Sequence, residues 1–296
     1  MAAVDTRIVT GFEQDAVPLR GELRAHCYRM LASWDDADDA LQETYLRAWR
    51  AWEGFEGRAS VRTWLYRIAT RVCLDAAAGR AARALPADVD ALGPDLPGSS
   101  RPVRWIGPFP GDSDDLRLAF IAVLQSLPPS QRAVLLLRDV LGFSAAESAE
   151  LLETSVPAVK STLQRARRRV AREAPVAADV VEPRDPAVRR LVEAYIGAFA
   201  RGDVDLLLSV LRADAVLELV PEGFARAGKA ACAPVLADAV AHSGTWEMTP
   251  ATVNGAPGAV VRLDGSPYGA TVLDVRPDGI ARITVFRDPS LPRRLA

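Results

Sequence analysis

The sequence predicts two all-α domains joined by a Pro/Gly-rich linker, followed by a C-terminal α+β domain. Three observations lead to this fold class. Apolar residues recur at three- and four-residue steps over most of 12–78 and 114–172, as in helices with one buried face. Residues 85–111 contain six prolines and four glycines without periodicity, which is typical of a linker. After a second linker at 174–186, helical patterns give way to short apolar runs bounded by Gly, Pro and Asp, which indicate strands.

Composition limits the class of protein. The chain has 296 residues, 49% apolar and 25% charged, which suits two or three globular domains. It contains no apolar run of the roughly 18–20 residues that a membrane span needs, and its first residues lack the pattern of a signal peptide. Cys27, Cys73 and Cys232 form no CxxC motif, and only two histidines are present. We therefore expect a cytoplasmic protein with free thiols, no metal site and no cofactor.

The formal net charge of -2 hides a segregation of charge along the chain. Residues 35–43 are rich in Asp and Glu, whereas residues 155–172 contain no acidic residue and many arginines. Such a chain can bind an anionic polymer at one surface and a basic protein surface at another.

The helix expected at 38–52 has two distinct faces. Its acidic start also suits the helix dipole, which is a sufficient local explanation of the acids. The apolar face contains Leu41, Tyr45, Ala48, Trp49 and Trp52, and the exposed face contains Asp39, Gln42, Glu43, Arg47 and Arg50.

The helix expected at 60–78 mixes arginine and aromatic side chains on its exposed part. Arginine pairs with phosphate and an aromatic ring stacks on an unpaired base, so this mixture suits single-stranded DNA. Burial in the core is the alternative for Trp64. The residues concerned are Arg62, Trp64, Tyr66, Arg67 and Arg71.

Residues 144–172 predict a helix-turn-helix. Ser144 and Glu147 have the spacing of a capping box, and Ser155 is a good N-cap for a second helix with Pro157 in its first turn. In a helix-turn-helix the second helix enters the major groove; a solvated basic face on a helical hairpin is the alternative. The second helix turns Val156, Val159, Leu163, Ala166 and Val170 inward and exposes Lys160, Ser161, Gln164, Arg165, Arg167, Arg168, Arg169 and Arg172.

These two blocks carry a resemblance to a known family. Residues 36–75, DADDALQETYLRAWRAWEGFEGRASVRTWLYRIATRVCLD, resemble region 2 of the extracytoplasmic-function (ECF) sigma factors. Residues 124–172, which begin LQSLPPSQRAVLLLRDVLGF, are similar to their region 4. The resemblance implies a non-enzymatic transcription initiation factor that binds core RNA polymerase and promoter DNA.

The resemblance also implies roles for individual residues. Arg71 stands where many relatives have asparagine, so the base preference at −10 does not carry over. Polymerase binding is implied for Asp38, Asp39, Gln42, Glu43 and Trp49; −10 DNA binding for Arg62, Trp64, Arg67 and Arg71; and −35 DNA binding for Ser155, Lys160, Ser161, Gln164, Arg165 and Arg168.

The first linker contains the motif Trp105-Ile106-Gly107-Pro108-Phe109-Pro110. Large apolar side chains in a loop usually dock on a surface, so we expect Trp105 and Phe109 to pin the linker to the protein itself. Similar linkers occur in ECF sigma factors with an extra C-terminal domain.

The last segment resembles the SnoaL-like cone fold, chiefly over 195–219 and 277–286. Helices are expected at 188–200, 204–211 and 229–241, and strands at 215–220, 245–253, 259–263, 269–275 and 279–287, the last four as an antiparallel meander. A catalytic cone would need an acid–base pair. The candidates Glu218, Glu247, Asp264, Asp274 and His242 are scattered, so a regulatory domain is favoured, with a small ligand in the cone left open.

The resulting domain limits are 8–80 for region 2, 81–113 for the linker, 114–174 for region 4 and 187–290 for the SnoaL-like domain. Two alternatives remain. A ligand-sensing helix-turn-helix regulator that acts without polymerase leaves the acidic block and the Arg/Trp helix unexplained. A SnoaL-type enzyme fused to a DNA-binding module predicts turnover.

Overall fold

The computed structural model describes residues 6–78, 80, 83–85, 104–110, 116–173, 185–242 and 244–295. The chain divides into two compact units, one formed by residues 1–83 with 120–174 and the other by 84–119 with 175–296. Most of both predicted linkers, 86–103 and 174–184, lies outside the described residues.

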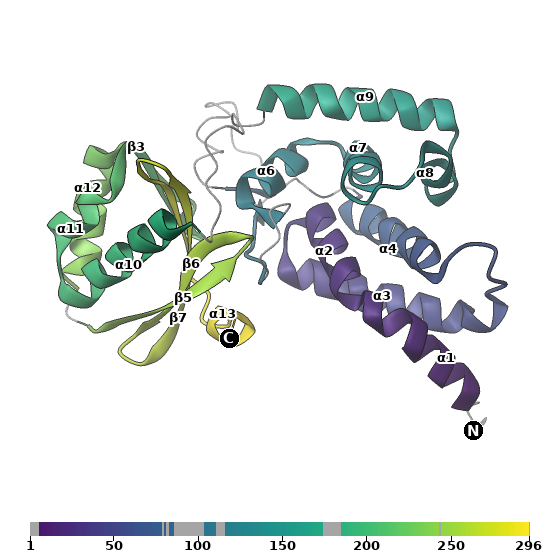
Figure 1. Cartoon of the computed structure of the whole chain (residues 1–296), viewed down its shortest axis with the longest axis horizontal. Coiled ribbons are helices and arrows are strands. Elements are labelled where there is room, and N and C mark those ends of the chain that lie inside the picture. Colours follow the sequence, from purple (N-terminus) through teal and green to yellow (C-terminus); the bar gives the residue numbers. More distant parts are fainter. Residues whose placement is uncertain are drawn as a thin grey trace. The chain divides into compact units, whose positions relative to one another are not determined.

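The second, third and fourth helices pack against one another, and the first extends away from the second toward the N-terminus (Figure 1). The third helix begins at Trp34 rather than at the predicted residue 38, because Ser33 Oγ accepts a hydrogen bond from Asp36 N at 3.3 Å and caps it. Leu23, Leu41 and Leu65 lie in the shared core. The helices are α1 (Thr6–Ala16), α2 (Arg20–Leu31), α3 (Trp34–Ala51) and α4 (Val61–Ala77), with short 3₁₀ turns at Val17–Leu19 and Trp52–Gly54.

The same unit contains the predicted helix-turn-helix. Its capping box is present: Glu147 N donates to Ser144 Oγ at 3.1 Å, and Ser144 N donates to Glu147 Oε2 at 2.7 Å. The helix expected from residue 114 begins at Leu118, and the helix expected at 129–141 ends in a π-helical turn. The elements are α6 (Leu118–Ser126), α7 (Pro129–Leu135), the π turn Leu136–Val140, α8 (Ala145–Leu151) and α9 (Val156–Glu173).

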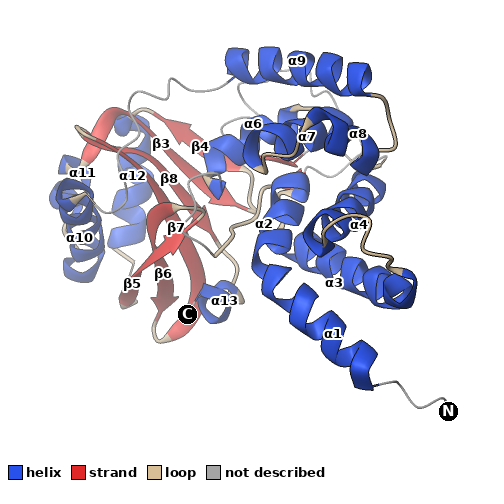
Figure 2. Cartoon of the chain, turned by 45° about the vertical axis from the view of Figure 1, so that its right-hand side comes forward, coloured by secondary structure: helices blue, strands red, loops and turns tan. Residues whose placement is uncertain are grey.

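The second unit contains the expected α+β domain. Six of the described strands form a sheet in the order β4-β3-β8-β7-β6-β5, and the helices α10, α11 and α12 cover one face of it (Figure 2). Tyr195, Phe199 and Leu236 of these helices share a core with Leu217 and Ile283 of the sheet. The elements are α10 (Pro186–Arg201), α11 (Val204–Ser209), β3 (Leu211–Val220), β4 (Phe224–Ala227), α12 (Lys229–Val240), β5 (Trp246–Val253), β6 (Ala256–Leu263), β7 (Ser266–Arg276), β8 (Gly279–Phe286) and α13 (Leu291–Leu295).

The sheet differs from the prediction in three ways. β5 to β8 form the expected antiparallel meander, but β8 pairs in parallel with β3, so the sheet is mixed. β3 starts at Leu211, four residues early, because an irregularity between Leu211 and Val216 breaks the alternation that marks a strand. The short strand β4 and helix α13 were not predicted. No described helix has both the length and the apolarity of a membrane span.

Candidate functional site

The acidic face of α3 combines free-standing and locally paired polar side chains. Asp39 and Gln42 are exposed. Asp38 lies 3.2 Å from Arg24 and accepts a hydrogen bond from Gln42 Nε2 at 3.0 Å. Glu43 accepts a hydrogen bond from Arg47 Nε at 2.6 Å, an i,i+4 pair within the helix. The N-terminal half of α3 therefore presents Asp39 and Gln42 to solvent, with Asp38 and Glu43 partly exposed beside them.

Two apolar residues flank this acidic face. Trp49 is half-buried and packs edge-on against Phe12 of α1, with ring centroids 5.3 Å apart. Leu46 is 50% exposed and lies one turn from Gln42 and Glu43 on the same face. The sequence analysis did not identify Leu46 as a candidate binding residue. The available signal was its position outside the predicted apolar face of the helix.

Arg62 of α4 lies between aromatic rings and a carboxylate. Its guanidinium is 3.2 Å from Glu22, 4.9 Å from the centre of the Tyr66 ring and 5.3 Å from that of Phe143. Tyr66 OH donates to the same Glu22 carboxylate at 3.3 Å, and burial, with the Glu22 charge as a second cause, raises the pKa of Tyr66. Arg62 is therefore held in place by protein groups, one of which, Phe143, comes from the segment that leads into the helix-turn-helix.

Trp64 belongs to an aromatic cluster at the start of α4. Its ring centroid lies 4.9 Å from that of Phe55 and 5.9 Å from that of Trp52, and its side chain is half-buried. The exposed arginines one and two turns further along α4 face a carboxylate of the helix-turn-helix. Arg67 Nη2 donates to Glu153 Oε1 at 3.0 Å, and Arg71 Nη1 lies 3.8 Å from Glu153 Oε2.

On α9 the candidate DNA-binding side chains form an exposed polar face. Ser155 Oγ accepts a hydrogen bond from Ala158 N at 3.3 Å and so caps the helix. Arg167 makes a two-pronged contact with Asp139, at 2.8 and 2.6 Å. Hydrogen bonding to this carboxylate raises the pKa of Arg167. The exposed candidates are Ser155, Lys160, Ser161, Gln164, Arg165 and Arg168.

Within the second unit, the first linker contacts the C-terminal domain through Asn254, in the turn between β5 and β6. Asn254 N donates to Phe109 O, and Phe109 N donates to Asn254 Oδ1, both at 2.8 Å. Asn254 Nδ2 donates to Leu116 O at 2.8 Å, and Pro110 forms an isolated bridge with Val253. The Trp105 ring lies against Gly223, where an added Cβ would come within 2.8 Å of it.

The five candidate acid–base residues of this domain differ in burial and in their contacts. Glu218 is fully buried and accepts hydrogen bonds from Arg282 and Thr284, both at 2.9 Å. Asp264 accepts a hydrogen bond from Thr245 N at 2.8 Å. Glu247 and His242 are exposed. These contacts give no acid–base pair among the five.

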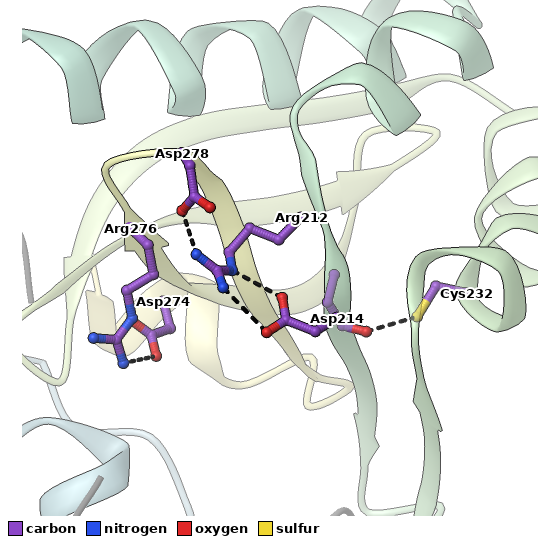
Figure 3. Close-up of polar contacts among 7 residues, drawn as sticks. Arg212, Asp214, Cys232, Asp274, Arg276 and Asp278 are labelled. Atoms are coloured by element: carbon purple, nitrogen blue, oxygen red, sulfur yellow. Dashed lines mark hydrogen bonds and ion pairs between the residues drawn. The ribbon is translucent and has the colours of Figure 1, made fainter. Parts of the chain in front are cut away.

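Asp274 lies beside a surface cluster of ion pairs (Figure 3). It pairs with Arg276 at 3.0 Å, while Arg212 binds both Asp214, at 2.8 Å, and Asp278. Hydrogen bonding to Asp214 and Asp278 raises the pKa of Arg212, and hydrogen bonding to Arg212 lowers that of Asp214. Since Arg212 and Asp214 lie within the irregular part of β3, between Leu211 and Val216, this cluster ties that segment to the β7–β8 turn.

Comparison with known proteins agrees with this architecture. Family models for "Sigma-70 region 2" and "Sigma-70, region 4" match residues 18–83 and 117–170. The ECF RNA polymerase sigma factor SigG of Mycobacterium tuberculosis is 40% identical over 303 aligned residues, which cover 95% of this chain and 82% of SigG.

Two further relatives match nearly the whole chain. The probable ECF RNA polymerase sigma factor SigI of the same organism is 28% identical and covers 92% of this chain and 94% of SigI. The crystal structure of the M. tuberculosis ECF sigma factor SigJ shares the fold, with a TM-score of 0.64, 23% identity and coverage of 95% of this chain and 97% of SigJ. The chain belongs to the ECF sigma factors of RNA polymerase, which bind core polymerase and promoter DNA and direct the initiation of transcription.

Proposed function

We propose that three surfaces of the first unit divide the work of initiation. The acidic face of α3 binds core polymerase, α4 holds the −10 element, and α9 reads the −35 element. The observation that carries this assignment is the separation of charge between the two helices: the N-terminal half of α3 exposes Asp35 and Asp39, whereas α9 exposes Lys160, Arg165 and Arg168. Electrostatic complementarity of this kind selects the partner of each surface.

Leu46 adds an apolar contact to the proposed polymerase surface. Interface hot spots combine an apolar centre with surrounding polar groups, and Leu46 is half-exposed among Gln42, Glu43 and Arg50. Asp39 and Gln42 are the most accessible of the proposed contacts. Trp49, packed on Phe12, contributes by fixing α1 against α3 as well as by its exposed edge.

The −35 assignment predicts the effect of removing two arginines from α9. The double substitution Arg165→Ala, Arg168→Ala should weaken binding of holoenzyme to promoter DNA and reduce the slope of log K against log salt by about two, because about two phosphate contacts are lost. Arg167→Ala is the matched control, since Arg167 is tied to Asp139. Filter-binding titrations at several salt concentrations measure the affinity and its salt dependence for each variant. An equal change in slope for the control would contradict the assignment.

We further propose that the C-terminal domain modulates initiation by holding the first linker. The support comes from Asn254, which is fully buried and makes three hydrogen bonds to the backbone of Phe109 and Leu116. Leu116 lies two residues before α6, so the C-terminal domain is hydrogen-bonded to the chain close to the start of region 4. In this proposal the C-terminal domain acts on the linker rather than as an enzyme. The proposed domain limits remain 8–80 for region 2, 81–113 for the linker, 114–174 for region 4 and 187–290 for the C-terminal domain.

Substitution of Asn254 by aspartate tests the hydrogen bonds between the C-terminal domain and the linker. Asp keeps the acceptor for Phe109 N but places a second acceptor against Leu116 O, so a buried donor–acceptor pair becomes a repulsive contact. We expect amide hydrogen exchange in 104–116 to accelerate about tenfold, because a lost buried hydrogen bond of this kind costs about 1–3 kcal/mol. Promoter activity with saturating core polymerase should change in parallel.

Asp264→Asn is the matched control. Asp264 occupies the corresponding place in the β6–β7 turn, with a φ of 52° against 54° for Asn254, and accepts its hydrogen bond from Thr245 N within the same domain. This variant should leave both exchange in the linker and transcription unchanged. Release of the linker in Asn254→Asp without any change in transcription would refute the modulatory role.

A further inference from the structure

Glu153 is the residue of the helix-turn-helix that contacts the proposed −10 surface. Its two carboxylate oxygens face different arginines of α4: Oε1 accepts a hydrogen bond from Arg67 at 3.0 Å and Oε2 lies 3.8 Å from Arg71. The hydrogen bond to Arg67, followed by the charges of Arg67 and Arg71, lowers the pKa of Glu153. Two guanidinium groups around one anionic group is the arrangement that a DNA phosphate would also satisfy.

The backbone at Glu153 adds a second observation. Glu153 follows α8 in the left-handed conformation, with a φ of 52°, and Thr154 N donates to Ala149 O at 2.9 Å in the manner of a helix C-cap. Glycine is the usual residue at such a position because it has no Cβ. A glutamate here carries a conformational cost that helix termination does not require, so its side chain calls for a separate explanation.

Other contacts hold the same two segments together and place Glu153 in register. Phe143, which precedes α8, packs edge-on against Tyr66 with ring centroids 5.5 Å apart. The Arg62 guanidinium lies 5.3 Å from the Phe143 ring. Arg62, Arg67 and Arg71 of α4 therefore all face groups from the helix-turn-helix segment, and these are three of the four residues proposed to bind −10 DNA.

We propose that Glu153 is an intramolecular substitute for a DNA phosphate, which occupies Arg67 and Arg71 in the free protein and must leave before the −10 strand can bind. The proposal rests on the assignment of these arginines to −10 DNA. Because the Arg67 and Glu153 side chains are 47% and 59% exposed, the pair is screened by solvent, and DNA can displace it when polymerase separates the two segments. Glu153 thus lowers non-specific binding of single strands without blocking the bound state.

The test compares Glu153→Gln with wild type in binding a fluorescein-labelled mixed-sequence DNA single strand, using the free full-length protein. Glutamine keeps the shape of the side chain but loses its charge. We expect about threefold tighter binding, the range of an exposed ion pair, and faster hydrogen exchange in α4 and in the turn at 152–155. Glu150→Gln is the matched control, because Glu150 is exposed on the same helix-turn-helix and the substitution makes the same change in net charge.

Removing the two arginines separates a specific latch from a general charge effect. In the Arg67→Ala, Arg71→Ala background, Glu153→Gln should give no further gain in binding. An equal gain in that background, or an equal gain from Glu150→Gln, would overturn the proposal. The assignment of the arginines is tested separately: if Arg67→Ala, Arg71→Ala leaves promoter opening by holoenzyme intact, the −10 assignment fails, whereas loss of opening together with no effect of Glu153→Gln refutes only the latch.

Discussion

Reversing two charges on α3, Asp39→Arg with Glu43→Arg, is expected to abolish co-elution of the protein with core RNA polymerase. Asp39 is exposed, and Glu43 is half-exposed and pairs with Arg47 of its own helix at 2.6 Å, so neither side chain is needed to close the core. Each reversal replaces an attractive contact with a repulsive one at the centre of the proposed surface. The combined loss should be at least about 100-fold in affinity.

The control makes the same change in net charge elsewhere in region 2. Glu13 and Asp15 of α1 are exposed, and Glu13→Arg with Asp15→Arg should leave co-elution within a few-fold of wild type. Size-exclusion chromatography at two salt concentrations separates specific docking from general attraction. Equal losses in both double variants would show that net charge, rather than the α3 face, governs binding.

Replacing Arg132 with alanine is expected to cause the largest loss of stability in the first unit. The side chain is 4% exposed, and its guanidinium donates to the carbonyl oxygens of Leu124, Gln125 and Leu127 at 2.8, 3.2 and 3.1 Å, and to that of Met30. It therefore satisfies the carbonyls that end α6 and one near the end of α2. Burial lowers its pKa to about 10, so it stays charged at neutral pH.

Without this guanidinium, several buried carbonyl groups lose their donor. We expect the free energy of opening at α6 and the end of α2 to fall by about 3–5 kcal/mol, measured by native-state hydrogen exchange, which does not require the whole chain to unfold in one step. Arg138→Ala is the graded control: Arg138 donates to one carbonyl, that of Phe143, and its loss should cost about 1 kcal/mol. Similar effects from both substitutions would refute the special role of Arg132.

Local sequence signals predicted much of the fold because they act within one element. The period of Leu41, Tyr45 and Ala48 marked α3, and Ser144 with Glu147 marked the start of α8. The mixed character of the sheet could not be predicted from local signals, because the parallel pairing of β3 with β8 joins segments far apart in the sequence. Strand β4 is too short to show a period.

The candidate sites also divide into features that local sequence signals predicted and features that depend on tertiary contacts. Charge and aromatic content along one helix indicated the faces of α3, α4 and α9, and the family resemblance supplied their roles. The contacts of Glu153 and Asn254 depend on residues far away along the chain. Arg71 lies 82 residues before Glu153, and Leu116 lies 138 residues before Asn254. At most, a glutamate where glycine usually ends a helix and an Asn-Gly turn hint at them.

The central claim is that this protein gives core RNA polymerase its promoter specificity. It is tested most directly by reconstituted transcription from fragmented genomic DNA of the source organism, with sequencing of the transcript 5′ ends. The account predicts discrete start sites that require the protein, share a −35 and a −10 sequence, and disappear with Asp39→Arg, Glu43→Arg. Sequence-specific binding of the protein to DNA without polymerase, together with no protein-dependent transcript, would contradict it and favour a ligand-sensing helix-turn-helix regulator.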